Sequence, residues 1–576
     1  MSGVGKGITT SSIGAILQSK GFAVNLLKVD PYLNVDAGTM NPVEHGEVFV
    51  LDSGLETDQD MGNYERFLNR SLTGDDYITS GMVYKHVIEA ERALKYGGKC
   101  VEAIPHIRDE IIHRFQKSGK VNESDITVVE IGGTVGDYQN IMFIEAARVI
   151  KVMHPNDVAF VMVSYMPIPS KLGEMKSKPT QNAIRQLNSY GVNSDIIIAR
   201  SEVPMDQKRK EKIAISCSLP VDQVISAPDI ESVFDVPLNF EKDNMGHMLM
   251  KLLHLRKKQN EIGIHDWVNF ANKVKNTKET IDIAIVGKYF NTGDFVLTDA
   301  YVSVLEAIKY SSYKLGKKAV IHTVNSRDYE GKHKRHADFK ALEKFDGIIV
   351  PGGFGESGIE GKLAVIEYVR ENKIPYFGLC YGMQLMVIEY ARNVLGLKDA
   401  NTAEINPHSK NLVINIIDDQ KKKLEMCDFG GSMRLGAYDA NLTRGTIAHN
   451  AYKKDIIQER HRHRYEVNTE YIEQLTDAGL VFSGKSPSGV LMEIAELPKK
   501  VHPFFLGTQF HPEFQARPLA PHPLFTEFIK EAIKRKSKWY SFDLIFINVI
   551  VLCRCTKTSR LVSYFFFGRV NEKSIW

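Results

Sequence analysis

Short apolar runs and amphipathic segments alternate along the chain in two successive series. Strand-like runs of the first series cover residues 22–29, 126–131, 158–165, 195–199 and 224–227. Those of the second series cover residues 281–287, 318–324, 347–351 and 504–510. Helical patterns lie between consecutive runs, and strands that alternate with helices are typical of parallel sheets in α/β proteins. The pattern therefore predicts an α/β fold with two domains.

A change in composition separates the two series. From about residue 256 to residue 280 the chain is charged and helical, which indicates an interdomain linker. We therefore expect a first domain over residues 1–255, a linker over 256–280 and a second domain over 281–536. Residues 537–576 have no helical periodicity and an isolated Cys553-x-Cys555, so we expect this tail to lie outside both folds.

Overall composition narrows the class of protein. A chain of 576 residues is too long for one hydrophobic core, and 43% hydrophobic with 25% charged residues is ordinary for a globular protein. The net charge of +3 predicts no nucleic-acid partner. Six scattered cysteines indicate a reducing compartment, for which we expect the cytoplasm. No apolar run approaches the roughly 20 residues that cross a bilayer, so we expect no membrane partner.

The most informative motif of the second half is Gly378-x-Cys380-x-Gly382. An apolar run precedes it and a helical pattern follows it. This is the sulfur version of a nucleophile elbow, in which glycines allow a sharp strand-to-helix turn and the helix N-terminus favours a thiolate. A buried structural cysteine is the alternative for this motif taken alone.

Three further features accompany Cys380. His511, in Phe510-His511-Pro512-Glu513, is a candidate base for the thiol, and Glu513 is a candidate to orient the imidazole. A glycine turn that includes Gly353 ends an apolar run. We expect the backbone amide of this turn and that of Tyr381 to form an oxyanion hole. Glu404 and Arg464 suit the charged ends of an amino acid. For each feature alone, an ordinary turn, a core histidine or surface charges are reasonable alternatives.

Taken in order, these motifs resemble a class I glutamine amidotransferase domain. The resemblance implies a catalytic triad of Cys380, His511 and Glu513. It implies glutamine binding by Gly353, Tyr381, Gly382, Met383, Gln384, Glu404 and Arg464. Ammonia released at this site needs an acceptor, and we expect the first half of the chain to bind it.

The first half begins with a candidate phosphate loop. Ser2-Gly3-Val4-Gly5-Lys6-Gly7 places backbone amides and a lysine at a helix start, and no strand precedes it in the sequence. We therefore expect a P-loop-like parallel sheet whose first strand is missing. Asp60 and Glu130 are hard carboxylates that suit Mg²⁺, and residues 176–181 suit a triphosphate. A plain turn, solvated acids and a basic surface loop are the respective alternatives.

Five longer phrases identify the chain as similar to the CTP synthase family over roughly residues 1–535. They cover residues 28–36, 44–50, 63–67, 104–107 and 176–181. The resemblance implies ATP-dependent amination of UTP at C4, with ammonia from L-glutamine. It also implies Mg²⁺, GTP as an allosteric activator acting through Gly430–Gly436, CTP as a feedback inhibitor, and homotetramers that form filaments.

Ligand residues of the first domain follow from the same resemblance. It implies ATP binding by Gly3, Val4, Gly5, Lys6, Gly7, Ile8 and Asp60, and metal binding by Asp60 and Glu130. It implies UTP or CTP binding by Ser2, Asp137, Tyr138, Gln139, Lys176, Ser177, Lys178, Pro179, Thr180, Gln181 and Lys212. Lys28 would neutralise charge at the transferring phosphate.

The sequence departs from the family pattern at three places. The family carries a strand and a Gly-Gly turn before Ser2, an Asp-Ile-Glu where this chain has Asp137-Tyr138-Gln139, and a Leu where it has Tyr381. These departures keep two alternatives open. One is a catalytically impaired homologue that acts as a filament or scaffold subunit, and the other is a glutaminase that serves another synthase.

Overall fold

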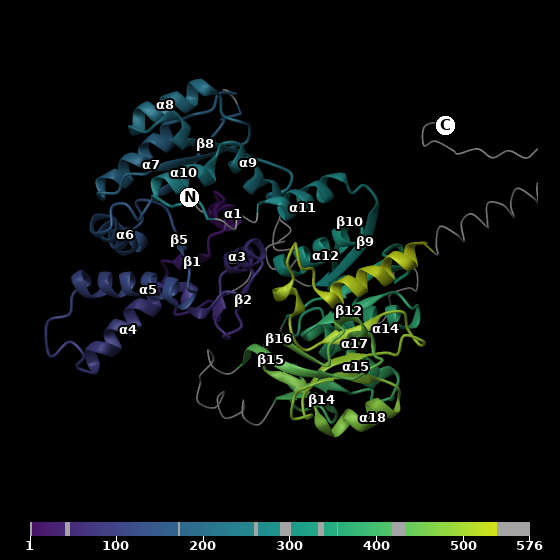
Figure 1. Cartoon of the computed structure of the whole chain (residues 1–576). Helices are drawn as coiled ribbons and strands as arrows, with labels where there is room; N and C mark the ends of the chain where they lie inside the picture. The colour runs from purple at the N-terminus through teal and green to yellow at the C-terminus, as the bar shows by residue number, and fades with distance from the viewer. Residues whose placement is uncertain are drawn as a thin grey trace, which may run out of the picture.

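The fold is described from a computed structural model of the chain (Figure 1). The described residues are 3–40, 46–170, 173–258, 263–287, 301–331, 339–353, 355–416 and 433–537. Ser2, residues 430–432 of the expected GTP loop at 430–436 and the tail beyond Ser537 therefore lie outside the described residues.

The first domain contains two separate three-stranded sheets, and every strand pair within them is parallel. One sheet has the order β4-β1-β5, and the other has the order β6-β7-β8. Their strands are β1 (Val24–Asp30), β4 (Tyr77–Thr79), β5 (Ile126–Ile131), β6 (Val161–Tyr165), β7 (Ile196–Ser201) and β8 (Val224–Pro228). The register places Lys28 of β1 opposite Glu130 of β5, which brings two predicted site residues together.

Helices cover both sheets, and a short hairpin of β2 (Phe49–Val50) and β3 (Glu56–Thr57) projects from the domain. The helices are α1 (Lys6–Ser19), α3 (Asp60–Leu68), α4 (Ser80–Arg92), α5 (Arg108–Val121), α6 (Ile141–Met153), α7 (Lys178–Ser189), α8 (Gln207–Cys217), α9 (Val236–Lys242) and α10 (Met245–Leu252). The central helix α1 contacts β1, β5, α3 and α9, so the candidate phosphate loop at its start lies at the centre of the domain.

A cavity of about 970 Å³ lies between the two sheets. Both edge strands, β5 and β6, line it along their whole length, together with Val4, Lys6 and Ile13 of the first segment. Within the described residues, no strand pairs with the open edges of β5 and β6. The predicted parallel architecture of the first domain is confirmed.

The second domain is built on a nine-stranded sheet of order β10-β9-β11-β12-β20-β19-β18-β15-β16. The strands from β10 to β20 in that order are parallel, and the remaining pairs are antiparallel. They are β9 (Thr280–Gly287), β10 (Lys318–Asn325), β11 (Gly347–Val350), β12 (Tyr376–Leu379), β15 (Arg434–Leu442), β16 (Ile456–His463), β18 (Val481–Lys485), β19 (Met492–Glu496) and β20 (Phe505–Thr508). β11 and β12 are buried at every position, which explains their unbroken apolar sequences.

Helices and a small second sheet complete this domain. The helices are α12 (Val302–Lys314), α14 (Ile359–Glu371), α15 (Tyr381–Asn393), α17 (Ile447–Tyr452) and α18 (Ile472–Asp477). The small sheet contains β13 (Asn401–Thr402), β14 (Leu412–Ile416) and β17 (Tyr465–Val467). None of the helices in the described ranges is long and apolar enough to cross a membrane.

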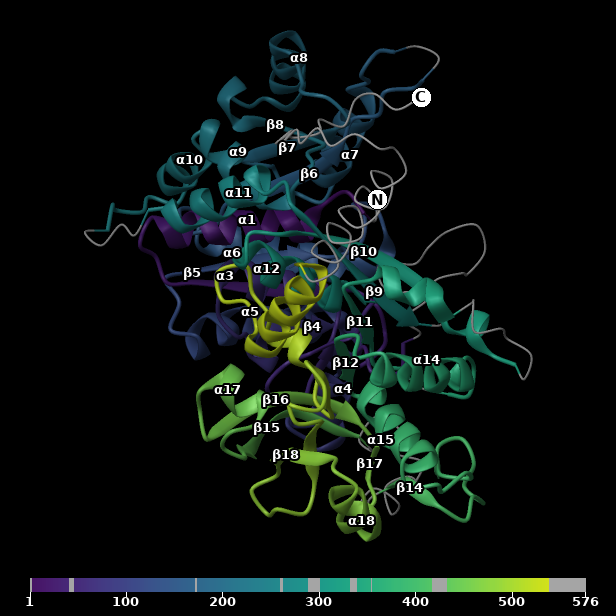
Figure 2. The same cartoon turned by 90° about the vertical axis from the view of Figure 1, so that its right-hand side faces the viewer.

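The two domains share a hydrophobic core. Phe67 and Phe234 of the first domain pack against Trp267, with ring centroids 4.8 and 6.0 Å away. Trp267 belongs to α11 (His265–Asn276), so the stretch predicted as a linker contains a helix that packs between the domains. In both views α3 and α12 lie side by side, and Arg66 of α3 donates a hydrogen bond of 2.6 Å to Ser303 of α12 (Figures 1 and 2).

Candidate functional site

Cys380 lies at a strained turn between β12 and α15. Its φ of 48° and ψ of −99° are rare for a residue with a side chain, and such strain concentrates at functional sites. A Cβ on Gly378 would lie 2.7 Å from the carbonyl carbon of Gly382, and one on Gly382 would lie 2.1 Å from the Val350 oxygen. The turn therefore requires both glycines, and it holds the cysteine at the first turn of α15.

His511 and Glu513 lie together beside this cysteine. Nδ1 of His511 is 2.7 Å from Oε1 of Glu513, and both residues are buried. Burial alone would lower the pKa of His511, but the negative charges of Glu513 and Cys380 raise it to about 10. This arrangement favours an imidazolium beside the sulfur of Cys380, and a cysteine nucleophile reacts as the thiolate.

The predicted oxyanion and glutamine residues surround the same turn. An added Cβ on Gly352 would lie 2.8 Å from Cε1 of His511, whereas one on Gly353 would meet nothing within 4 Å. The N–H of Tyr381 belongs to the first turn of α15 and has no acceptor within the helix. Open space therefore lies in front of Gly353, and its neighbour Gly352 adjoins the N-terminus of α15, because an added Cβ there would lie 3.8 Å from the Cβ of Cys380.

Polar side chains extend the site beyond the cysteine. Glu404 accepts a hydrogen bond of 2.8 Å from the Gly355 amide. Burial and the nearby Glu404 raise the pKa of Tyr465, and Arg464 opposes this effect. Nε2 of Gln384 donates to the Tyr465 carbonyl at 2.9 Å. Met383 instead packs within the apolar core against β20, so its side chain supports the elbow from beneath.

A second centre, in the first domain, surrounds Lys28. Its Nζ lies 2.5 Å from Asp60, 3.0 Å from Glu130 and 3.7 Å from Asp30. Although burial would lower it, these carboxylates hold the pKa of Lys28 well above its usual value. Burial and the neighbouring Asp30 raise the pKa of Asp58 to about 8. One buried lysine therefore faces several acids, and the excess negative charge favours a further cation.

The geometry of Asp60 and Glu130 fits a magnesium site that a nucleotide completes. The described residues contain no cluster of three or more acidic, histidine or cysteine ligands ready to hold a metal. Mg²⁺ is commonly held by one or two carboxylates together with substrate phosphates. Asp60 packs directly on Gly7, where an added Cβ would lie 2.1 Å from its Oδ1, so this carboxylate adjoins the phosphate loop.

The phosphate loop leads into α1. Gly3 and Gly5 have φ values of 73° and 82°, and Gly5 is the N-cap of a helix whose first turn contains no acid. Backbone N–H groups at such a helix start favour anions.

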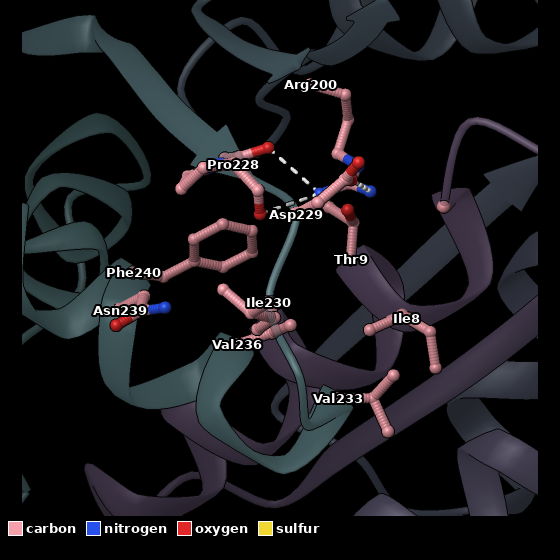
Figure 3. Close-up of a pocket in the computed structure, with 12 residues that line it drawn as sticks. Ile8, Thr9, Arg200, Pro228, Asp229, Ile230, Val233, Val236, Asn239 and Phe240 are labelled. Carbon is pink, nitrogen blue, oxygen red and sulfur yellow. Dashed lines mark hydrogen bonds and ion pairs between the residues drawn. The ribbon is translucent and has the colours of Figure 1, made fainter. Parts of the chain in front are cut away.

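A cavity of about 200 Å³ adjoins this loop (Figure 3). Gly5, Ile8 and Thr9 form one wall, and Phe240 and Arg200 form part of the other. The Arg200 guanidinium is held by the Ala227 carbonyl at 2.9 Å and by Asp229 at 2.7 Å. Sequence reasoning missed Arg200, although it lies near the carboxyl end of β7, the edge where α/β sheets bind ligands.

The predicted pyrimidine residues form a cationic corner. Lys176 pairs with Glu174 at 2.6 Å, and Lys176, Arg209 and Lys212 together lower the pKa of Glu174. Arg209 is an addition to the predicted set, and the basic run at residues 208–210 was its signal. Ser177 precedes α7, which begins with Lys178, Pro179, Thr180 and Gln181.

The other residues predicted to bind the pyrimidine nucleotide differ in their exposure to solvent. The Thr180 hydroxyl is fully buried and accepts a hydrogen bond from Ser164 at 3.0 Å, so it secures α7 to β6. Asp137 accepts a hydrogen bond of 2.9 Å from the Thr134 amide, Tyr138 is 92% exposed and Gln139 is exposed. The loop at residues 137–139 thus presents its side chains outward.

Comparisons with known protein families give a match to each of the two domains. The family model described as CTP synthase N-terminus matches residues 1–255, and the model for glutamine amidotransferase class-I matches residues 296–531. A CTP synthase of Pyrococcus abyssi is 46% identical over 540 residues, covering 93% of this chain and 97% of the relative. One of Halalkalibacterium halodurans is 44% identical over 536 residues, covering 93% and 98%.

Among solved structures, the glutaminase domain of Trypanosoma brucei CTPS with bound acivicin matches with 41% identity. It covers 44% of this chain and 94% of that domain, with a TM-score of 0.41. The identities and coverage of the full-length relatives, together with the two family models, leave one assignment: the chain belongs to the CTP synthase family.

Proposed function

We propose that this protein converts UTP to CTP by ATP-dependent amination at C4, with ammonia supplied by hydrolysis of glutamine. The observation that carries the proposal is that one chain brings together two separate sets of chemically suited groups. Cys380, His511 and Glu513 form a nucleophile, a proton carrier and its orienting acid. Lys28, Asp60 and Glu130 form a charged centre beside a phosphate loop.

In the second domain, the Cys380 thiolate attacks the carboxamide carbon of glutamine. His511 gives a proton to the leaving nitrogen, the C–N bond breaks, and ammonia leaves behind a thioester. Water, deprotonated by the same imidazole, then hydrolyses the thioester to glutamate and restores the thiol. The amides of Gly353 and Tyr381 support the oxyanion, and Glu404 and Arg464 bind the charged ends of glutamine.

In the first domain, residues 3–8 hold the phosphates of ATP, and the cavity lined by Phe240 and Arg200 receives the purine. The γ-phosphoryl group passes to O4 of UTP, which makes this oxygen a good leaving group. Ammonia then attacks C4, and phosphate departs. Lys28 balances charge at the transferring phosphoryl group, and Lys176 and Lys212 attract the UTP triphosphate. Mg²⁺ held by Asp60 and Glu130 would neutralise phosphate oxygens.

Several regulatory properties belong to the same proposal. GTP activates glutamine hydrolysis through the loop at residues 430–436, and CTP inhibits at a site that overlaps with UTP near residues 137–139. The protein acts in the cytoplasm as homotetramers that form filaments. The end of this loop adjoins the first domain, because Ala437, next to Gly436, donates a hydrogen bond of 2.9 Å to the Asp52 carbonyl.

The test is a direct assay of the purified chain. CTP formation is followed by chromatography with UTP, ATP and Mg²⁺, and with either glutamine or ammonia as the nitrogen source. Product from both sources supports the proposal. If neither source yields CTP, the proposed function is wrong.

The cavity between β5 and β6 favours a second candidate, an impaired homologue that serves as a filament subunit. The same assay separates the two, because such a subunit would form assemblies visible by electron microscopy without forming CTP from ammonia.

A further inference from the structure

Arg460 of β16 connects the glutaminase base to the other domain. Its backbone carbonyl accepts a hydrogen bond of 2.8 Å from the N–H of His511. Its side chain is fully buried and reaches into the first domain, where Nε lies 2.5 Å from Asp52 and a terminal nitrogen lies 3.0 Å from Glu65. Another donates to the Val50 carbonyl at 3.1 Å. The catalytic histidine is thus one hydrogen bond away from an arginine that the other domain holds.

An aromatic stack joins the same two parts. The imidazole of His511 stacks on Phe514, with ring centroids 5.0 Å apart and an interplanar angle of 16°. Phe514 in turn meets the edge of Phe49 of the first domain at 5.1 Å. The guanidinium of Arg460 lies 5.4 Å from the centre of that Phe49 ring. The β2–β3 hairpin therefore contacts both supports of His511.

The same hairpin continues into the nucleotide centre. Asp52 lies between β2 and β3, and α3 follows three residues after Thr57 with Asp60 at its start. Glu65, the second partner of Arg460, is on α3 as well, about one and a half helical turns from Asp60. Asp60 contacts both Lys28 and Gly7 of the phosphate loop. A single short helix thus has a nucleotide ligand at one end and the Arg460 contact towards the other.

We propose that Arg460 is a positioning residue that couples occupancy of the nucleotide centre to the alignment of His511. The β2–β3 hairpin and α3 transmit the position of Asp60 to the Arg460 guanidinium, and the Arg460 carbonyl transmits it to His511. Glutamine hydrolysis then proceeds fastest when ATP and UTP hold Asp60 in place, so that ammonia is released when an acceptor is ready. The inference rests on the proposed function, because it assigns a residue that joins its two reactions.

The electrostatics of this contact make the arginine specific. The charge of Arg460 is balanced by Asp52 and Glu65, and these acids raise its pKa even though burial would lower it. Lysine keeps the charge but cannot reach Asp52, Glu65 and the Val50 carbonyl at once, because it lacks the planar guanidinium. Arg460→Lys therefore weakens the junction without leaving two buried acids unbalanced.

The test compares Arg460→Lys with wild-type protein in three assays: CTP from ammonia, CTP from glutamine, and glutamate released with and without ATP and UTP. We expect CTP formation from ammonia to stay within about twofold. The stimulation of glutamine hydrolysis by ATP and UTP should fall at least about fivefold, the lower range of typical coupling between sites. The effect should fall on kcat, with KM for glutamine unchanged, and glutamate released per CTP should rise.

Arg444→Lys is the matched control. Arg444 is an exposed arginine of the same domain that pairs with Asp455 at 2.8 Å and touches neither centre. It should behave as wild type in all three assays. If Arg460→Lys folds poorly, Arg460→Gln combined with Glu65→Gln removes the buried charge from both sides and should show the same loss of stimulation.

Two results would overturn the proposal. One is unchanged stimulation by ATP and UTP in Arg460→Lys and in the double variant. The other is a parallel loss of all three activities and of the melting temperature, which would assign Arg460 a structural role alone. Failure of the proposed function is recognised separately, because wild-type protein would then form no CTP from either nitrogen source.

Discussion

Nδ1 of His511 lies 2.7 Å from Oε1 of Glu513, and both groups are buried beside Cys380. Glu513 and Cys380 raise the pKa of His511 to about 10 from an ordinary value of 6.5, against the opposing effect of burial. The imidazolium is therefore the ground state at neutral pH. The contact between His511 and Glu513 therefore affects the stability of the folded protein as well as catalysis.

The pH dependence of that stability is the first prediction. A group whose pKa is raised by folding stabilises the folded state fully below its unfolded pKa, and this contribution is lost as pH rises through the folded pKa. Glu513→Gln removes the carboxylate that holds the proton. The difference in free energy of unfolding between wild type and this variant should be largest below about pH 6.5 and should diminish towards pH 10.

Urea denaturation monitored by fluorescence at a series of pH values measures this difference. Glu473→Gln is the control, since Glu473 lies in the first turn of α18, a short helix away from the triad. A difference that stays constant across the pH range would show that the Glu513 carboxylate does not stabilise the imidazolium.

Cys380→Ala should separate the two reactions. We expect glutamine-dependent CTP formation to fall at least about a thousandfold, because the covalent intermediate needs the sulfur. Ammonia-dependent formation should stay within about twofold, because the first domain is unchanged. Cys217→Ala, at the end of α8, is the matched control and should retain both activities. Loss of ammonia-dependent synthesis in Cys380→Ala would contradict the division into two sites.

The elbow could be predicted from the sequence because all its determinants are local. Gly378, Cys380 and Gly382 define the turn within five residues, and the buried parallel strands around it have unbroken apolar sequences. Arg460 could not be assigned in this way, because its partner Asp52 is 408 residues distant in the sequence. The cavity beside the phosphate loop could not be predicted for a related reason. Its walls combine the start of α1 with segments near residues 200 and 228–240.

Two larger structural features also could not be predicted from the pattern of apolar and polar residues. In the antiparallel half of the second sheet, β15 alternates buried positions with partly or fully exposed ones. The fully buried β19 contains Glu493 and Glu496, so neither strand has a continuous apolar signal. The charged stretch at residues 256–280 indicated a linker, but three apolar residues of α11, Trp267, Phe270 and Ala271, are buried between the domains. A few apolar positions in a charged helix are enough to place it in a core.

Lys28 is the target of the third prediction. Lys28→Gln removes the cation that contacts Asp60 and Glu130, so repulsion between acids and phosphates is no longer balanced. We expect CTP formation from both glutamine and ammonia to fall by about a hundredfold or more, the typical cost of losing a group that stabilises transition-state charge. Basal glutamine hydrolysis without nucleotides should remain.

Lys117→Gln is the control for this change, because Lys117 is half exposed and pairs with Asp75 at 2.7 Å away from the site. The two activities and the melting temperature are measured for both variants. Ammonia-dependent synthesis that survives in Lys28→Gln would remove Lys28 from the phosphoryl-transfer centre.

The open edges of β5 and β6 provide the last prediction. The cavity of about 970 Å³ between them is lined by apolar side chains of both strands and by Val4 and Ile13 near the phosphate loop. We expect a chain extended before Met1 by an apolar strand and two glycines to fill it, joining the two sheets and ordering Gly3. Each large apolar side chain that becomes fully buried contributes roughly 1.5–3 kcal/mol, so the melting temperature should rise by several degrees. ATP-dependent CTP formation should rise with it, because the loop gains the strand that aims its amides at the phosphates. An extension of equal length made of glycine and serine should change neither quantity, since it buries no apolar surface. Equal effects of the two extensions would show that the cavity is not a site for a strand.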